Sequence, residues 1–337
     1  MSAGTLNPSF AAEAPAKSSG TRWIISRQDD LVWFVGTALA GYLALGLLSA
    51  GVSLTLLTAV WLVGVDGPQV FGTLTRTCFD QQERRRLGWR LWASLPMLFI
   101  GPLAVYSKQG ALFYLIAVCW LQYHNTTQQM GFVRQWKARN REQDAFDIKL
   151  DRWFLLASGL CPLALLVIKT RPPSILGSLL ATDIVATYPI LVVIFAIYQL
   201  RKWRAGKPMN PPKLLFMAVL VPLQWLAYGY AARFGPDGIV RAGIALGLVH
   251  SLQYQRLMWF LNKNEKHASA AVPARKFGYY LIAAAGSYVV AELVPQTVFP
   301  ADRLVAALLG IVFMRYVLDR KIWRDREHKE LAAALHL

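Results

Sequence analysis

Long uncharged apolar runs recur along this chain from residue 31 onward, and they constrain its fold more than any other feature. The hydrocarbon core of a bilayer is about 30 Å thick, so a helix that crosses it needs about 20 consecutive apolar residues. Apolar residues make up 55% of the 337 residues and charged residues 16%, whereas a typical soluble domain is about 25% charged. The sequence therefore excludes a soluble multidomain protein and predicts an all-α, polytopic integral membrane helix bundle.

Turn-forming residues divide the apolar runs into about ten expected transmembrane helices. We expect residues 1–30 to form a flexible cytoplasmic tail, residues 31–319 the ten-helix transmembrane domain, and residues 320–337 a basic cytoplasmic tail. Asp29 and Asp30 precede the first run and are expected N-caps. The expected spans are 31–50, 53–75, 89–106, 110–133, 153–169, 178–200, 213–231, 238–261, 277–297 and 301–319.

Lys and Arg residues are distributed unequally between the two sides of this ten-helix arrangement. Of the 36 Lys and Arg residues, 30 fall on the side of the N-terminal tail and 6 on the other. Cytoplasmic segments carry the excess of positive charge, so both termini are expected in the cytoplasm. The net charge of +17 then indicates contact with anionic lipids on the cytoplasmic side rather than with nucleic acid. We expect an integral membrane protein of a bacterial inner membrane.

The longest expected connection, residues 134–152, contains charges of both signs. We expect it to form a surface helix. No connection is long enough for a soluble catalytic domain, so any chemistry is expected in or beside the bilayer.

Three of the expected spans contain polar residues at a depth where the bilayer disfavours them. Asp66, His124 and His250 lie 13, 14 and 12 residues into the second, fourth and eighth spans, which all run in the same direction. At 1.5 Å per residue, these depths agree within about 3 Å. A charged group at the centre of a spanning helix costs about 2.5–3.5 kcal/mol, so polar residues there indicate function. We expect the three side chains to meet near the middle of the membrane.

Five further polar residues lie near these three in the same spans, several of them at helical spacing on a shared face. We expect them to line the same pocket and to orient the imidazoles. They are Gln69, Thr73, Gln128, Gln253 and Tyr254.

Arginines follow each of the three central residues toward the cytoplasm. Arg76 and Arg134 come ten residues after the first two, Arg256 comes six after the third, and Arg315 lies near the end of the tenth span. These side chains can extend to lipid phosphates. Alternatively, they form a basic collar that holds the lipid headgroup or the anionic end of an amphiphilic substrate.

Four interpretations of the central residues remain open. Asp66, His124 and His250 form the two-histidine, one-carboxylate ligand set of non-haem Fe(II) oxygenases. The two histidines can instead ligate a haem or chlorophyll-type pigments. The same residues can form a hydrogen-bonded core that fixes helix packing, or a proton relay in a transporter. The sequence lacks paired broken helices in corresponding halves, which disfavours the transporter.

The polar segments of these spans resemble the Brp/Blh family of integral membrane β-carotene 15,15′-dioxygenases. That family is multi-helical and holds a non-haem iron through a Pro-His pair in an early span, a His-rich segment midway and a later His. The corresponding segments here are Gly67-Pro68-Gln69, residues 123–129 and residues 249–254.

The resemblance implies that His124 and His250 are metal ligands. Gln69 stands where the family has a histidine, and Gln128 or Gln129 stands in place of its second mid-chain histidine. A four-histidine site therefore cannot be assembled, so either Asp66 completes a different site or the scaffold persists without the metal.

The sequence favours a membrane-embedded, non-haem iron oxygenase-like protein that acts on a lipophilic substrate, for example an isoprenoid. The alternative is a non-catalytic membrane subunit that binds pigment, haem or lipid within a larger inner-membrane complex. Either function is compatible with a homo- or hetero-oligomer.

Overall fold

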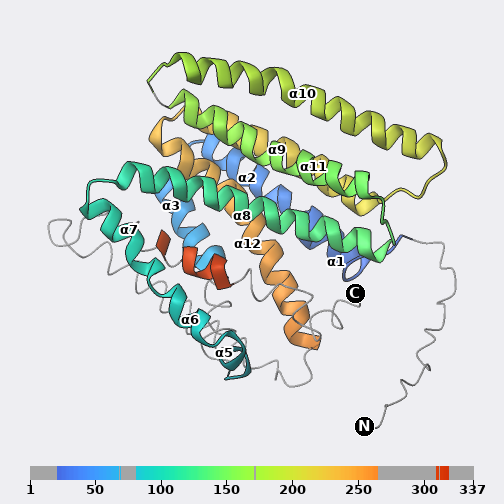
Figure 1. The fold of residues 1–337 in the computed structure, drawn as a ribbon, viewed down its shortest axis with the longest axis horizontal. Helices are drawn as coiled ribbons and strands as arrows, with labels where there is room; N and C mark the ends of the chain where they lie inside the picture. The colour runs from blue at the N-terminus through green and yellow to red at the C-terminus, as the bar shows by residue number, and fades with distance from the viewer. Residues whose placement is uncertain are drawn as a thin grey trace, which may run out of the picture.

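The computed structural model describes residues 21–67, 69, 81–170, 172–264, 309–310 and 312–318. In this part of the chain every regular element is helical and none is a strand, which confirms the all-α prediction (Figure 1). Two elements, η1 and η2, are π-helical. The elements are α1 (Arg27–Asp29), η1 (Asp30–Val35), α2 (Thr37–Ser49), α3 (Leu54–Ala59), η2 (Val60–Asp66), α5 (Gln81–Leu87), α6 (Trp89–Ser94), α7 (Met97–Tyr106), α8 (Gly110–Arg139), α9 (Ala145–Lys169), α10 (Ile175–Arg204), α11 (Pro211–Ala231) and α12 (Pro236–Asn264).

Four helices in the described residues are long and apolar enough to cross a membrane. One is the continuous run Arg27–Ser49, and the others are α9, α10 and α11. Helices α8 and α12 have 30 and 29 residues, so each is about 45 Å long, but polar residues interrupt their apolar sequences. The protein is thus an all-helical chain with several helices of membrane-spanning character.

Several expected spans differ from the helices in detail. The third expected span is divided between α6 and α7, with Leu95 and Pro96 between them. The surface helix expected at residues 134–152 is absent from this described segment, because α8 continues to Arg139 and α9 already begins at Ala145. The expected span 277–297 and the C-terminal tail lie outside the described residues.

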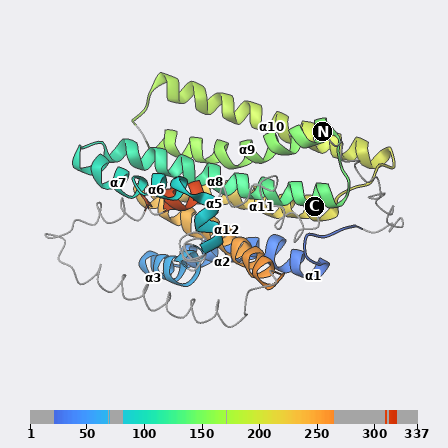
Figure 2. The same cartoon turned by 60° about the horizontal axis from the view of Figure 1, so that its bottom comes forward.

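The helices pack in layers with α10 on the outside. Helix α9 contacts α8, α10 and α11, and α12 contacts α2, α11 and η2. Both views place α10 along one edge of the bundle and α9 beneath it (Figures 1 and 2). A large aromatic cluster joins η1, α8 and α11: Phe34 lies 4.7 Å from Phe132, and Trp136 lies 5.3 Å from Phe216, measured between ring centroids.

Two glutamines of α12 satisfy carbonyl groups of the π-helical segments. Gln253 Nε2 donates to the Phe34 carbonyl in η1 at 2.8 Å, and Gln255 Nε2 donates to the Val65 carbonyl in η2 at 2.6 Å. The hydrocarbon core provides no water for backbone groups, so such side-chain donors stabilise irregular backbone inside a membrane protein. These contacts hold η1 and η2 against α12.

The N-terminal tail is shorter than expected, because residues from about 22 onward pack against the bundle. Ile24 is buried, and the Asp30 carboxylate accepts hydrogen bonds from the backbone N–H groups of Ile24 and Ile25 at 2.7 and 3.0 Å. Trp136 Nε1 donates to the same carboxylate at 2.6 Å. Asp29 and Asp30 do not cap the first helix as expected; Ser26 does, through its hydroxyl group. Residues 1–20 lie outside the described part.

We predict that Asp30→Ala destabilises the protein strongly. The substitution leaves two backbone N–H groups and the Trp136 indole without an acceptor, and each such buried donor costs about 1–3 kcal/mol. Thermal unfolding in detergent should show a loss of at least about 3 kcal/mol. Trp136→Phe removes one of the three bonds and should cost less; equal losses in both variants would contradict this account of Asp30.

Candidate functional site

Two histidines from helices distant in sequence lie ring to ring inside the bundle. His124 lies at the middle of α8 and His250 at the middle of α12. Their ring centroids are 5.4 Å apart and the ring planes are nearly perpendicular, at 76°. The prediction that these two side chains meet agrees with this geometry. We call them the histidine pair.

Neighbouring residues hold both imidazoles in place. Gln69 Nε2 lies 3.0 Å from His250 Nε2, and the Tyr316 ring stacks on His124 with centroids 3.5 Å apart and an 11° angle between planes. His250 is 3% exposed, and its Nδ1 atom has no hydrogen-bond partner among the described residues. A buried ring nitrogen without a partner is costly, so this atom is a candidate ligand of a bound group.

Asp66 lies near the pair but contacts other residues. Its Oδ1 atom accepts a hydrogen bond from Ser251 Oγ at 3.0 Å and lies 3.8 Å from Arg315 NH1. In the part of the chain that the structure describes, no three His, Cys, Asp or Glu side chains form a group at metal-binding spacing. The structure therefore brings the two histidines together and directs Asp66 to Ser251 and Arg315.

Arg315, which was expected in the basic collar, and Tyr316, for which no role was expected, both lie beside the histidine pair. Arg315 is 1% exposed, and its guanidinium group lies over the Tyr316 ring at 4.8 Å. The missing signal lies in the depth of Arg315, which is 14 residues into the expected span 301–319, the same depth as His124 in its own span. The expectation that Arg315 lies near a helix end beside lipid headgroups does not agree with its burial.

The two imidazoles meet edge to face. Their centroid separation of 5.4 Å and interplanar angle of 76° lie within the range of about 4.5–7 Å that edge-to-face ring contacts show in protein interiors.

The other predicted pocket residues are divided between the site and the surrounding backbone. Gln69 contacts the His250 ring, whereas Gln128 Nε2 donates to the His250 carbonyl at 3.1 Å. Gln253 binds a carbonyl of η1 instead of the histidine pair, which is a correction to its expected role, and Tyr254 is buried. Thr73 lies outside the described residues.

The predicted basic collar is not assembled in the described residues. Arg256 Nε donates to Asp29 Oδ1 at 2.9 Å, so this guanidinium group forms an ion pair within the protein rather than with a headgroup. Arg134 is exposed, and Arg76 lies outside the described residues. The only arginine found beside the histidine pair in this part of the chain is Arg315.

A second polar row lies on another side of α8. Tyr228 OH donates to Gln122 Oε1 at 2.7 Å, and Gln224 Nε2 donates to Gln129 Oε1 at 3.0 Å. A Cβ atom at Gly159 of α9 would lie 2.7 Å from Gln122 Nε2, so only glycine allows α9 to approach this row. These amides therefore join α8, α9 and α11, and they do not belong to the histidine pair.

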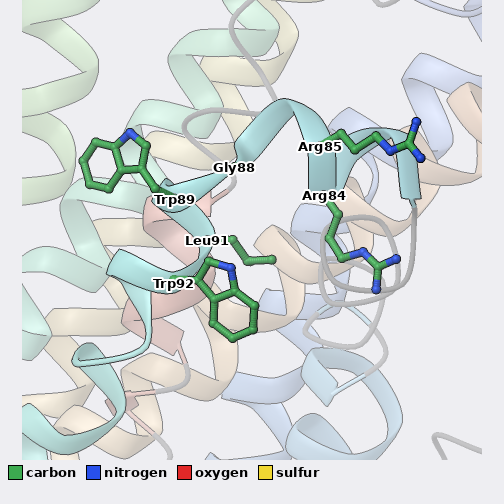
Figure 3. Close-up of a pocket in the computed structure, with 6 residues that line it drawn as sticks. All are labelled: Arg84, Arg85, Gly88, Trp89, Leu91 and Trp92. Atoms are coloured by element: carbon green, nitrogen blue, oxygen red, sulfur yellow. The ribbon is translucent and has the colours of Figure 1, made fainter.

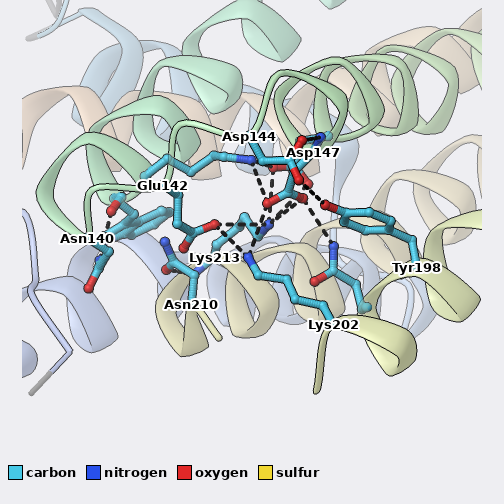
Figure 4. Close-up of polar contacts among 12 residues, drawn as sticks. Asn140, Glu142, Asp144, Asp147, Tyr198, Lys202, Asn210 and Lys213 are labelled. Carbon is cyan, nitrogen blue, oxygen red and sulfur yellow. Dashed lines mark hydrogen bonds and ion pairs between the residues drawn. The ribbon is translucent and has the colours of Figure 1, made fainter. Parts of the chain in front are cut away.

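A buried cluster of charged residues ties four helices together at one end of the bundle (Figure 4). Lys213 Nζ lies 3.4 Å from Asp147 Oδ1 and 3.1 Å from Asp151 Oδ2. Lys137 Nζ lies 2.6 Å from Asp151 Oδ2, and Lys202 Nζ lies 2.9 Å from Glu142 Oε2. The buried charge cluster, defined as Lys137, Glu142, Asp147, Asp151, Lys202 and Lys213, comes from α8, α9, α10, α11 and the α8–α9 connection.

The charges of this cluster balance, three positive against three negative. Burying a charge is tolerated only when it is paired and hydrogen-bonded, and the ion pairs described above meet that condition. The sequence predicts a surface helix at residues 134–152 rather than a buried charge cluster. The sequence signal for the cluster is the four-residue spacing of Asp147 and Asp151, which places both carboxylates on one helix face. The cluster therefore links α8, α9, α10 and α11 through ion pairs.

Asp144 lies beside this cluster and caps α9. Its carboxylate accepts hydrogen bonds from the backbone N–H groups of Phe146 and Asp147 and from the Tyr198 hydroxyl. The bond from the Asp147 N–H is the main cause of a lowered pKa for Asp144, followed by the Tyr198 bond. The charged form of Asp144 is therefore favoured, and it links α9 to α10.

Comparisons with known proteins identify no relative. No family model matches the chain, and neither a curated protein nor a solved structure gives a significant match.

We predict that Lys213→Met destabilises the bundle by about 3–5 kcal/mol, because it leaves Asp147 and Asp151 with too little positive charge in a buried site. Lys207→Met removes the same charge from an exposed position and should change stability by less than about 0.5 kcal/mol. Chemical or thermal unfolding in detergent measures both. If the two variants unfold alike, the cluster does not stabilise the helix ends.

Proposed function

We propose that the protein is a membrane-embedded, non-haem iron oxidoreductase of the oxygenase type, acting on a lipophilic substrate such as an isoprenoid. The observation that carries this proposal is the histidine pair itself. Two imidazoles from α8 and α12 lie 5.4 Å apart, and the buried Nδ1 atom of His250 lacks a hydrogen-bond partner in the described residues. The resemblance to the Brp/Blh family, which rests on the same histidines, supports it further.

The residues around the pair suit metal binding. A ligand histidine usually forms a hydrogen bond through its second ring nitrogen, which fixes the tautomer. Gln69 lies at that position on His250 Nε2. Rotation of the Gln69 amide group by 180° exchanges the positions of its oxygen and nitrogen atoms without changing the space that the group occupies. The amide oxygen would then accept the Nε2 proton, and the lone pair of Nδ1 would be available to a metal ion.

Asp66 is the proposed third ligand, and its negative charge would partly neutralise the positive charge of the metal ion. Its carboxylate lies between Ser251 and Arg315, so binding an ion would require it to exchange the Arg315 contact for the metal. An iron ion held by His124, His250 and Asp66 would supply dioxygen activation. The positive charge of Arg315 beside the pair would attract the polar end of the substrate.

Aromatic side chains beside the pair form a packed apolar cluster. Tyr316 stacks on His124, and one helical turn away Phe313 stacks on Trp120 at 5.3 Å between centroids. Phe113 meets Phe313 edge to face at 5.8 Å. Aromatic surroundings of this kind suit a conjugated or isoprenoid chain that enters from the bilayer, because they offer apolar contact.

The proposal includes ten spans with both termini in the cytoplasm of a bacterium, the protein lying in the inner membrane. The distribution of Lys and Arg supports this orientation. Contacts at one end of the bundle are compatible with it: Arg139 NH2 donates to the Ile24 carbonyl, and Lys202 pairs with Glu142. The N-terminal segment, the α8–α9 connection and the end of α10 therefore share one side.

Metal analysis of the detergent-purified protein tests the function. We expect about one iron per chain, and a loss of at least tenfold in iron content for His124→Ala and for His250→Ala. Gln224→Ala removes a buried polar group outside the site and should retain the iron, which controls for general loss of structure. Protein that folds but contains no iron, even after anaerobic loading with Fe(II), would refute the proposal. A Soret or chlorophyll absorbance band would indicate the pigment-binding subunit instead.

Removal of the Gln69 amide provides a second test. The Gln69→Leu variant removes the hydrogen bond at His250 Nε2 and leaves an apolar side chain in its place. Loss of the partner on the second ring nitrogen should weaken Fe(II) binding about tenfold or more, as measured by competition with a chelator. If the pair only packs helices, the variant should lose stability, and neither it nor the wild type should bind Fe(II).

A further inference from the structure

The corner between α5 and α6 forms an open depression that is separate from the histidine pair. Its volume is about 510 Å³, within the range of roughly 300–1,000 Å³ typical of small-molecule sites. The lining combines basic, aromatic and apolar residues. They are Arg84, Arg85, Gly88, Trp89, Leu91 and Trp92 (Figure 3).

Gly88 creates the corner and buried leucines hold it in place. Gly88 has φ +53°, a left-handed conformation that residues with a Cβ atom rarely adopt, and it turns the chain from α5 into α6. Leu87 and Leu91, on either side of it, are buried in a cluster with Met314 and Leu318. The side chains of the corner are therefore presented on a fixed backbone.

The charged and aromatic side chains of the corner face outward. Trp89 and Trp92 are 74% and 70% exposed, and Arg84 and Arg85 are also exposed. Figure 3 shows the two guanidinium groups on one side of Gly88 and the two indoles on the other. Among the described residues that line the depression none is acidic and two are arginines, so these side chains attract an anion.

We propose that this corner binds the phosphate headgroup of an anionic phospholipid. Guanidinium groups bind phosphate oxygens through paired, charge-assisted hydrogen bonds, and tryptophan prefers the boundary between headgroups and acyl chains. The next helix, α7, presents exposed apolar side chains such as Phe99, Ile100 and Leu103, which suit the acyl chains. A soluble phosphate compound would gain little from the indoles and Leu91. The proposal does not depend on the metal site.

Native mass spectrometry of the full chain in detergent tests it, with phosphatidylglycerol titrated against phosphatidylcholine. The wild-type protein should retain phosphatidylglycerol preferentially. Each arginine near an anionic surface contributes about fivefold in affinity, so Arg84→Gln combined with Arg85→Gln should weaken binding about 25-fold. Trp89→Ala combined with Trp92→Ala should weaken phosphatidylglycerol binding as well, because the indoles contact the glycerol and upper acyl region.

The end of α10 offers a matched control. Arg201, Trp203 and Arg204 are exposed there and have the same charges and an aromatic residue of the same type, but they are not among the residues that line the α5–α6 depression. Arg201→Gln combined with Arg204→Gln should leave phosphatidylglycerol binding within about twofold of wild type. Equal losses in both double variants, or no loss in either, would overturn the proposal. Displacement of the lipid by millimolar inorganic phosphate would also overturn it, by identifying a soluble ligand.

Discussion

Polar groups inside this helix bundle require partners from other helices, and this requirement organises the whole structure. A buried donor or acceptor without a partner costs about 1–3 kcal/mol, and the membrane interior supplies no water in its place. Gln253 therefore reaches a carbonyl of η1, Asp30 collects three donors, and three lysines meet three carboxylates where α8, α9, α10 and α11 come together. The contacts of Gln253 with η1, of Trp136 with Asp30 and of the lysines with the carboxylates join different helices, so together they select one packing of the helices.

The two buried polar centres differ in how completely their groups are paired. In the buried charge cluster, every lysine lies within 3.4 Å of a carboxylate oxygen, and the charges balance. At the histidine pair, His250 Nδ1 is buried and lacks a hydrogen-bond partner within the described residues. Each charge of the cluster is paired, although Glu142 Oε1 accepts no hydrogen bond among the described residues. At the histidine pair, a group that binds the buried Nδ1 atom would remove the cost of leaving it without a partner.

Much of the fold could be predicted from the sequence, and part of the site. The all-helical character is confirmed, and helices occupy each expected span that the structure describes from residue 31 to 261. The common depth of His124 and His250 placed both at one level, and their rings do meet. Spacing along a helix could not distinguish Gln69, which contacts the imidazole, from Gln253, which turns to a backbone carbonyl. Arg256 looked like a headgroup ligand because its partner Asp29 is far away in sequence.

The sequence by itself determined which segments form long apolar helices and how far along its helix each polar residue lies, because hydropathy and the rise of a helix are local properties of the chain. Only the tertiary structure decided which helix faces meet. The rotation of each helix about its axis depends on all of its neighbours at once. Packing therefore decided that Arg315 lies beside the histidines, that Asp66 contacts Ser251, and that lysines of three helices contact the carboxylates at the start of α9.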